Sequence, residues 1–101
     1  MSKQKSRNKE AARADTAFAF TDEAWEDYLH WQQADRKVLQ NINALLEECR
    51  RDPFTGTGKP EPLVGNLTGF WSRRITRADR LVYLPQDGLI YVIACRFHYG
   101  D

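Results

Sequence analysis

Hydrophobic positions are spaced like one face of a helix in the first half of the chain. Trp25, Tyr28 and Leu29 fall at i, i+3 and i+4, with Trp31 near the edge of the stripe. A second stripe continues for three turns and comprises Val38, Ile42, Leu45, Leu46 and Cys49, with Leu39 alongside. A recurrence of three or four residues is typical of an amphipathic helix. We therefore predict two consecutive helices, each with one apolar face, and the apolar face of the first helix could serve either the core or a dimer interface.

The ends of these helices are marked by residue types that suit them. Thr21 can cap the first helix, and the acidic residues that follow place negative charge over its positive end. Pro53 ends the second helix, because the residue before a proline is pushed out of the helical region.

Strand patterns flank the helices. Phe18 and Phe20 alternate with alanines, and three further strands are predicted at residues 70–75, 80–85 and 89–97. Asp87-Gly88 is typical of the hairpin turn between the last two strands. The order is β-α-α-β-β-β. We predict an α+β fold, with two N-terminal helices packed on a mainly antiparallel, four- to five-stranded sheet.

The period of two assigns the side chains of these strands to opposite faces. Arg73 and Arg74 must point to opposite faces, so one of them is exposed in either orientation. Arg80 shares a face with Val82 and Leu84. In the last strand we expect two alternating sets, Ile90, Val92, Ala94 and Arg96 against Tyr91, Ile93, Cys95 and Phe97.

The formal net charge of +1 averages three unlike segments. Residues 1–14 carry five basic residues and one acidic residue, residues 15–49 carry two and eight, and residues 50–101 carry eight and five. We expect an anionic partner to dock on the last segment, which holds seven of the ten arginines. Residues 1–16 are too poor in apolar side chains to fold and are interpreted as a flexible basic tail, whose charge could add weak nucleic-acid affinity. Residues 17–101 are the predicted single domain.

Length and composition exclude several classes of protein. A chain of 101 residues can bury one modest core but has no room for a dinucleotide-binding or barrel fold. Without a membrane-spanning run or a signal-peptide pattern, we expect a cytoplasmic protein with no membrane association. Cys49 and Cys95 are far apart in the chain and are expected to be buried thiols. With the two histidines they show no metal-ligand spacing, so no metal site is expected. No cofactor is expected either, because the chain is too short to form a large cofactor cradle.

His98 and Tyr99 directly follow the last predicted strand, beside strands that bear several arginines. Guanidinium groups bind phosphate in a bidentate manner and histidine exchanges protons near neutral pH, so this end of the sheet suits an anionic substrate. On the pattern alone, a frayed terminus beside a solvated charged face is the favoured alternative.

Glu61 lies between two prolines within a long, glycine-rich and proline-rich loop at residues 54–69. The prolines restrict the backbone on both sides and could aim the carboxylate as a positioned base. A stiff, exposed turn explains the same segment equally well, although loops longer than about 12 residues are often functional.

Several segments together resemble the YoeB toxins of the RelE superfamily, over about residues 17–99. The matching strings are Pro53-Phe54, Gly56-x-Gly58-Lys59-Pro60-Glu61-Pro62-Leu63, Asn66-Leu67-x-Gly69-Phe70-Trp71-Ser72-Arg73-Arg74-Ile75, Arg80-Leu81-Val82-Tyr83 and Ala94-Cys95-Arg96-x-His98-Tyr99. The resemblance implies a RelE-like fold and a metal-independent, ribosome-dependent endoribonuclease, the toxin of a bacterial type II toxin–antitoxin pair that cleaves messenger RNA in the ribosomal A site.

The resemblance also implies roles for individual residues. Glu61 matches the general base and His98 the general acid, with Tyr99 beside it. Arg74 and Arg80 match the phosphate-binding arginines, and Arg80 is counted with the catalytic set. We also assign Lys59 and Arg73 to the predicted substrate-binding residues.

The implied partners are the 70S ribosome with its A-site message, an acidic and partly disordered YefM-like antitoxin, and a second copy of the chain as a homodimer. Val64 follows the PEPL segment where the family commonly has lysine, and Gly100-Asp101 extends beyond the usual terminal tyrosine. These departures leave an alternative function open: a weakened toxin that acts mainly as an antitoxin-binding module and transcriptional co-repressor.

Overall fold

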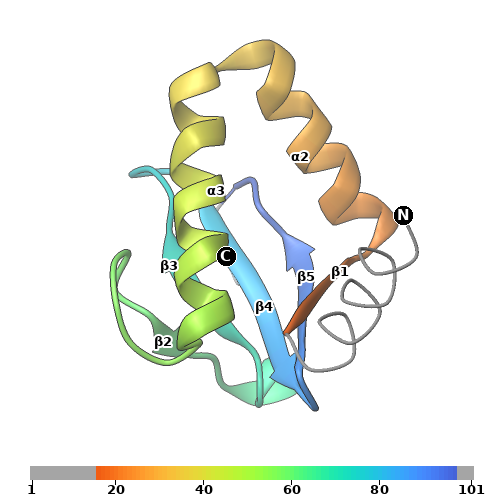
Figure 1. Cartoon of the computed structure of the whole chain (residues 1–101), viewed down its shortest axis with the longest axis vertical. Coiled ribbons are helices and arrows are strands. Elements are labelled where there is room, and N and C mark those ends of the chain that lie inside the picture. The colour runs from red at the N-terminus through yellow and green to blue at the C-terminus, as the bar shows by residue number, and fades with distance from the viewer. Residues whose placement is uncertain (1–15, 98–101) are drawn as a thin grey trace, which may run out of the picture.

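The computed structural model describes residues 16–97, which form a layer of two helices on a five-stranded sheet (Figure 1). The elements in chain order are β1 (Ala17–Phe20), α2 (Asp22–Ala34), α3 (Arg36–Arg51), β2 (Glu61–Pro62), the 3₁₀ turn η1 (Gly65–Leu67), β3 (Trp71–Arg74), β4 (Arg80–Gln86) and β5 (Leu89–Ala94). The predicted α+β class, with two N-terminal helices, is confirmed.

The sheet has the order β1-β5-β4-β3-β2. β1 pairs with β5 in parallel, whereas the other three pairings are antiparallel, as the prediction of a mainly antiparallel sheet required. β2 was not predicted as a strand. It lies within the long loop at residues 54–69 and brings Glu61 onto the edge of the sheet beside β3.

The hydrophobic core fills the space between the helices and one face of the sheet. The α3 stripe predicted from the sequence is buried at Ile42, Leu45, Leu46 and Cys49. Leu81 and Tyr83 from β4 meet it from the sheet. Cys49 and Cys95 are both buried, as predicted, and burial raises the pKa of both thiols, that of Cys95 to about 12. Both cysteines are therefore uncharged core residues at neutral pH.

Helix α2 begins as predicted but is rotated relative to the expected stripe. The Thr21 hydroxyl accepts a hydrogen bond from the Ala24 amide at 3.1 Å, which caps the helix. Trp25 is 48% exposed, while Trp31 packs against the core and donates its indole N–H to the Cys95 carbonyl at 2.8 Å. Ala24 is fully buried, and its small side chain allows the helix to approach the sheet.

The expected alternation in β5 is wrong beyond Val92. Val82 pairs with Ala94 and Tyr83 with Val92, so Ile93 is an extra residue in β5 and forms a β-bulge. The bulge moves Cys95 into the same core as Ile90 and Val92, instead of onto the opposite face. β5 ends at Ala94, three residues before the predicted end of the strand.

Two further expectations concern the basic tail and the absence of a membrane-spanning segment. The predicted basic tail falls on residues 1–16, of which residues 1–15 lie outside the described range. Neither helix within the described range has the length and apolar character needed to cross a membrane.

Candidate active site

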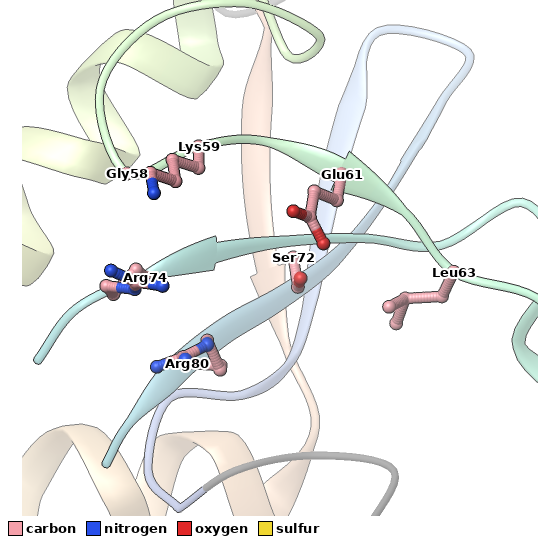
Figure 2. A pocket seen from close by; sticks show the side chains of 7 residues that line it. All are labelled: Gly58, Lys59, Glu61, Leu63, Ser72, Arg74 and Arg80. Carbon is pink, nitrogen blue, oxygen red and sulfur yellow. The ribbon is translucent and has the colours of Figure 1, made fainter. Parts of the chain in front are cut away.

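A cleft of about 290 Å³ lies on the sheet face opposite the helices. It is lined by Gly58, Lys59, Glu61, Leu63, Ser72, Arg74 and Arg80 (Figure 2). Gly58 and Lys59 come from the loop before β2, Glu61 from β2 and Leu63 from just after it. Ser72 and Arg74 come from β3, and Arg80 begins the neighbouring strand β4. The cleft therefore brings together four of the residues predicted for the site, namely Lys59, Glu61, Arg74 and Arg80.

The register of the sheet explains why these side chains meet. Glu61 pairs with Ser72 across β2 and β3, and Arg74 pairs with Arg80 across β3 and β4. Directly paired residues project to the same face, with Cβ atoms about 4.5–5.5 Å apart. Ser72 and Arg74 are two residues apart on β3, so all four side chains share one face. Figure 2 shows the Glu61 carboxylate above Ser72, with the two guanidinium groups beside each other.

Glu61 lies on an edge strand of only two residues. A backbone hydrogen bond from Leu63 N to Phe70 O, 2.8 Å long, fastens the chain just beyond it. Pro60 and Pro62 on either side have fixed backbone φ angles. The carboxylate is exposed, and within residues 16–97 no hydrogen bond or ion pair engages it. It is free to accept a proton or a hydrogen bond from a ligand in the cleft.

The two cleft arginines differ in how firmly they are held. Arg80 Nη1 donates to the backbone carbonyls of Thr76 at 2.9 Å and Asp79 at 3.0 Å. Arg74 is exposed, and its side chain makes no hydrogen bond or ion pair with any other described residue. Arg80 is thus oriented before any ligand arrives, while all the donors of the Arg74 side chain remain available.

Gly58 allows the loop to approach β3 closely at the rim of the cleft. Its backbone has φ +84°, a conformation that favours glycine, and its carbonyl accepts from Arg74 N at 2.7 Å. A Cβ atom at this position would lie 3.0 Å from the Arg74 carbonyl oxygen. Any side chain here would push the loop, and Lys59 with it, away from the arginines.

Arg73 does not belong to this site, and its prediction as a substrate-binding residue is corrected. Its side chain points to the helix-covered face and is completely buried. It donates to the carbonyls of Asp52, Thr55 and Thr57 at 2.8–3.1 Å, and to the Tyr83 hydroxyl at 3.0 Å. Arg73 therefore anchors the loop that leads from α3 to Lys59 and Glu61.

Tyr83 and Glu48 complete this anchor. The Tyr83 hydroxyl, whose pKa burial raises above its usual range, donates to the Pro53 carbonyl at 2.6 Å. A Glu48 carboxylate oxygen accepts from Thr57 N at 2.9 Å and lies 3.7 Å from Arg73 Nη1. The hydrogen bond from Thr57 is the main reason that the pKa of Glu48 is lowered. The loop is thus held on its core-facing side by a hydrogen-bond network in which each buried polar side-chain atom has a partner.

His98 and Tyr99, predicted as catalytic, lie outside the described residues. The described chain ends at Phe97, whose carbonyl accepts a hydrogen bond from Arg80 N at 3.0 Å. Phe97, which directly precedes His98 in the sequence, is therefore hydrogen-bonded to Arg80, a residue that lines the cleft.

Sequence reasoning missed Ser72, Gly58 and Leu63 as lining residues. Ser72 could have been found, because the period of two that separates Arg73 from Arg74 also places Ser72 with Arg74. The positions of Gly58 and Leu63 at the cleft depend on the pairing of β2 with β3. The sequence does not indicate this pairing, because β2 is only two residues long, follows Pro60 and contains Pro62.

The arrangement presents three cationic side chains and one unpaired carboxylate around a small, open cleft. Guanidinium groups bind phosphate oxygens, and a carboxylate can take up a proton from a hydroxyl group. Within residues 16–97 no cluster of His, Cys, Asp and Glu has the make-up of a metal site. Fold and cleft together define a class: a small α+β domain with a cationic cleft on the open face of its sheet.

Comparison with known proteins identifies the family within this class. Residues 20–99 match the model of the YoeB-like toxins of bacterial type II toxin–antitoxin systems. The YoeB toxin of Synechocystis sp. is 56% identical over 81 residues, which cover 80% of this chain and 94% of that protein. The chain therefore belongs to the YoeB family of toxins.

Solved structures of relatives have the same fold. The YoeB/ParE toxin of Agrobacterium tumefaciens superposes with a TM-score of 0.79 at 46% identity, covering 82% of this chain and 99% of that one. A YoeB–YefM complex from Staphylococcus aureus matches with a TM-score of 0.76 at 43% identity, covering 81% and 95%. A YoeB dimer from the same organism matches with a TM-score of 0.79 at 44% identity, covering 85% and 100%.

Proposed function

We propose that the chain is a ribosome-dependent endoribonuclease that cleaves messenger RNA in the ribosomal A site. The observation that carries the proposal is the cleft in which an unpaired carboxylate, Glu61, faces the same open space as Arg74 and Arg80. Membership of the YoeB toxin family gives this cleft its biological setting.

In the proposed reaction, Glu61 takes the proton from a ribose 2′-hydroxyl group. The 2′-oxygen attacks the adjacent phosphorus, and the bond from phosphorus to the 5′-oxygen of the next nucleotide breaks. His98 protonates that 5′-oxygen as it leaves. The products are a 2′,3′-cyclic phosphate, or the 3′-phosphate formed from it, and a 5′-hydroxyl group.

The arginines stabilise the charge that develops on the phosphoryl oxygens. Arg80 is held in advance by backbone carbonyls of the turn that precedes it, so little reorganisation is needed when the transition state forms. Arg74 adds a second guanidinium group with free donors. Lys59 contributes positive charge at the rim, and Tyr99 stacks on or hydrogen-bonds to the substrate nucleotide.

Dependence on the ribosome agrees with the charge of the chain. The formal net charge is +1, and the acidic residues are concentrated in the helical half. A single small cationic cleft binds few phosphates, so naked RNA should bind weakly and with modest salt dependence. The ribosome would supply the missing affinity by presenting the message. A toxin that acts on ribosomes in this way would work in the cytoplasm.

Two protein partners follow from relatives. The Staphylococcus aureus YoeB–YefM complex supports a YefM-like antitoxin as a partner of this chain. The cationic cleft favours an antitoxin segment that is acidic and partly disordered and that covers the cleft. The YoeB dimer of the same organism supports a homodimer. Half-exposed Trp25 and exposed Leu29 offer apolar surface for such a contact, and sedimentation velocity on wild type and Trp25→Ala measures it.

The test is induction of the chain alone in a bacterium, followed by primer extension on translated messages. We expect growth arrest and cleavage at A-site positions with the wild type, and neither with His98→Gln. Arg51→Ala, which removes an exposed arginine from α3, is the matched control and should behave like the wild type. Harmless accumulation of the wild type would contradict the nuclease and favour the antitoxin-binding co-repressor, which agrees with the highly exposed Val64 in place of a lysine beside the cleft.

A further inference from the structure

The turn between β3 and β4, residues 75–79, is held by the hydrogen bonds of one hydroxyl and one carboxylate. The Thr76 hydroxyl accepts from the amides of Ala78 and Asp79, both at 3.1 Å, and donates to Asp79 Oδ2 at 2.7 Å. Ile75 N closes the turn by donating to the Asp79 carbonyl at 2.9 Å. The Asp79 side chain is therefore fixed by its own turn.

The second oxygen of the same carboxylate reaches the end of the described chain. Asp79 Oδ1 accepts from Phe97 N at 2.7 Å, and the next residue, Arg80, donates its amide to the Phe97 carbonyl at 3.0 Å. Both backbone polar groups of Phe97 are thus held by two consecutive residues of β4 and its turn. Phe97 has φ +66°, an unfavourable conformation for a residue with a Cβ, which these two bonds hold in place.

The same turn also orients the Arg80 guanidinium group, through the carbonyls of Thr76 and Asp79. The turn consequently holds both Arg80, which lines the cleft, and Phe97, which directly precedes His98 in the sequence.

We infer that Asp79 is a positioning residue for the general acid: its carboxylate fixes the backbone of Phe97, the residue to which the proposed acid His98 is directly joined in sequence. The inference rests on the proposed function, in which His98 protonates the leaving oxygen. Asp79 does not line the cleft, so it acts through Phe97 and not on the substrate. A carboxylate suits the task because it offers two acceptor oxygens, one for Thr76 and one for Phe97.

The test compares two messages on the ribosome, one with a normal linkage and one with sulfur in place of the bridging 5′-oxygen at the cleaved position. A thiolate leaves without being protonated, so the second message does not need the general acid. With Asp79→Ala we expect kcat to fall by about tenfold to a hundredfold on the normal linkage, because a displacement of about 1 Å can cost that much. KM should stay within about twofold, and on the sulfur linkage kcat should stay within about twofold of wild type.

Two other substitutions calibrate the result. His98→Gln should show the same pattern as Asp79→Ala, with a larger loss on the normal linkage, whereas Glu61→Gln should lose activity on both linkages. Asp22→Ala, which removes an exposed aspartate from α2, is the matched control and should be normal on both. If Asp79→Ala does not fold, Asp79→Asn replaces it, with a smaller loss that is again confined to the normal linkage.

The outcomes separate the two proposals. A wild type that cleaves neither message contradicts the proposed function. A wild type that cleaves both, together with an Asp79 variant that retains full activity on the normal linkage, overturns the positioning role. Equal loss on both linkages also overturns it, because a general defect in folding or binding does not distinguish the leaving groups.

Discussion

Arg73 and Arg74 are adjacent in the sequence and have opposite environments in the fold. Arg73 is completely buried beneath the helices and uses its guanidinium group to hold backbone carbonyls of the loop after α3. Arg74 is exposed on the other face, beside Arg80, and its side-chain donors bond to no other described residue. The residue type alone does not distinguish a structural arginine from a ligand-binding one; the groups that occupy its donors do.

The comparison extends to the two faces of β3 and β4. The helix-covered face carries a satisfied network of Arg73, Tyr83 and Glu48 that fixes the loop, while the open face carries the charged cleft. We therefore expect substitutions on the first face to lower stability and substitutions on the second to lower activity.

The largest effect is expected for Arg73→Met. The substitution leaves three partly buried loop carbonyls and the buried Tyr83 hydroxyl without their donor, which should lower the free energy of unfolding by about 2–4 kcal/mol. Arg74→Met, the matched control on the other face, should change it by no more than about 0.5 kcal/mol. Urea denaturation of both variants measures the difference, and similar losses would contradict the division between the faces.

The next effect is expected for Arg80→Ala on activity. Loss of a preoriented guanidinium group should reduce kcat on ribosome-bound message by about 10²–10³. Lysine should not restore the rate, because an ammonium group cannot reproduce the planar fork of donors. Single-turnover cleavage measures the loss, with Arg51→Ala as the control; a variant within about threefold of wild type would remove Arg80 from the catalytic set.

A smaller effect is expected for Tyr83→Phe. The substitution removes the hydroxyl that accepts from Arg73 and donates to Pro53, and should lower the free energy of unfolding by about 1–3 kcal/mol. The cleavage rate of the folded variant should stay close to wild type, since the ring keeps its place in the core. A large loss of activity with unchanged stability would link Tyr83 to the site instead.

The smallest effect concerns the acid range. The pKa of Glu48 is lowered in the folded protein, so its charged form stabilises the fold above its usual pKa near 4.5, and this stabilisation is lost as the pH falls below that value. The Glu48 side chain is 37% exposed, which limits its contribution to the free energy of unfolding to under about 1 kcal/mol. Denaturation curves between pH 6 and roughly 3 should therefore show a steeper decline for wild type than for Glu48→Gln; parallel curves would contradict the role of Glu48.

Much of the fold follows from local signals. The cap at Thr21, the α3 stripe and the Asp87-Gly88 turn each depend on a few neighbouring residues, and the structure has all three. The bulge at Ile93 and the parallel pairing of β1 depend on contacts between distant strands, which no local pattern encodes.

The site was predictable to a similar degree. The period of two separates Arg73 from Arg74, but which of them is buried depends on where the helices pack. The connection from Asp79 to Phe97 joins residues 18 positions apart in sequence through a turn, and it has no signal in composition or spacing.

The most direct test of the central claim is the end chemistry of a ribosome-bound message cut by the purified chain in a reconstituted translation system. If the cleft on the open sheet face cleaves RNA by attack of a 2′-hydroxyl group, the fragment upstream of the cut ends in a 2′,3′-cyclic phosphate or a 3′-phosphate. The fragment downstream begins with a 5′-hydroxyl group. Both products should disappear with Glu61→Gln and persist with Glu26→Gln, which changes an exposed carboxylate on α2. A 5′-phosphate at the cut, or unchanged cleavage by Glu61→Gln, would contradict the account.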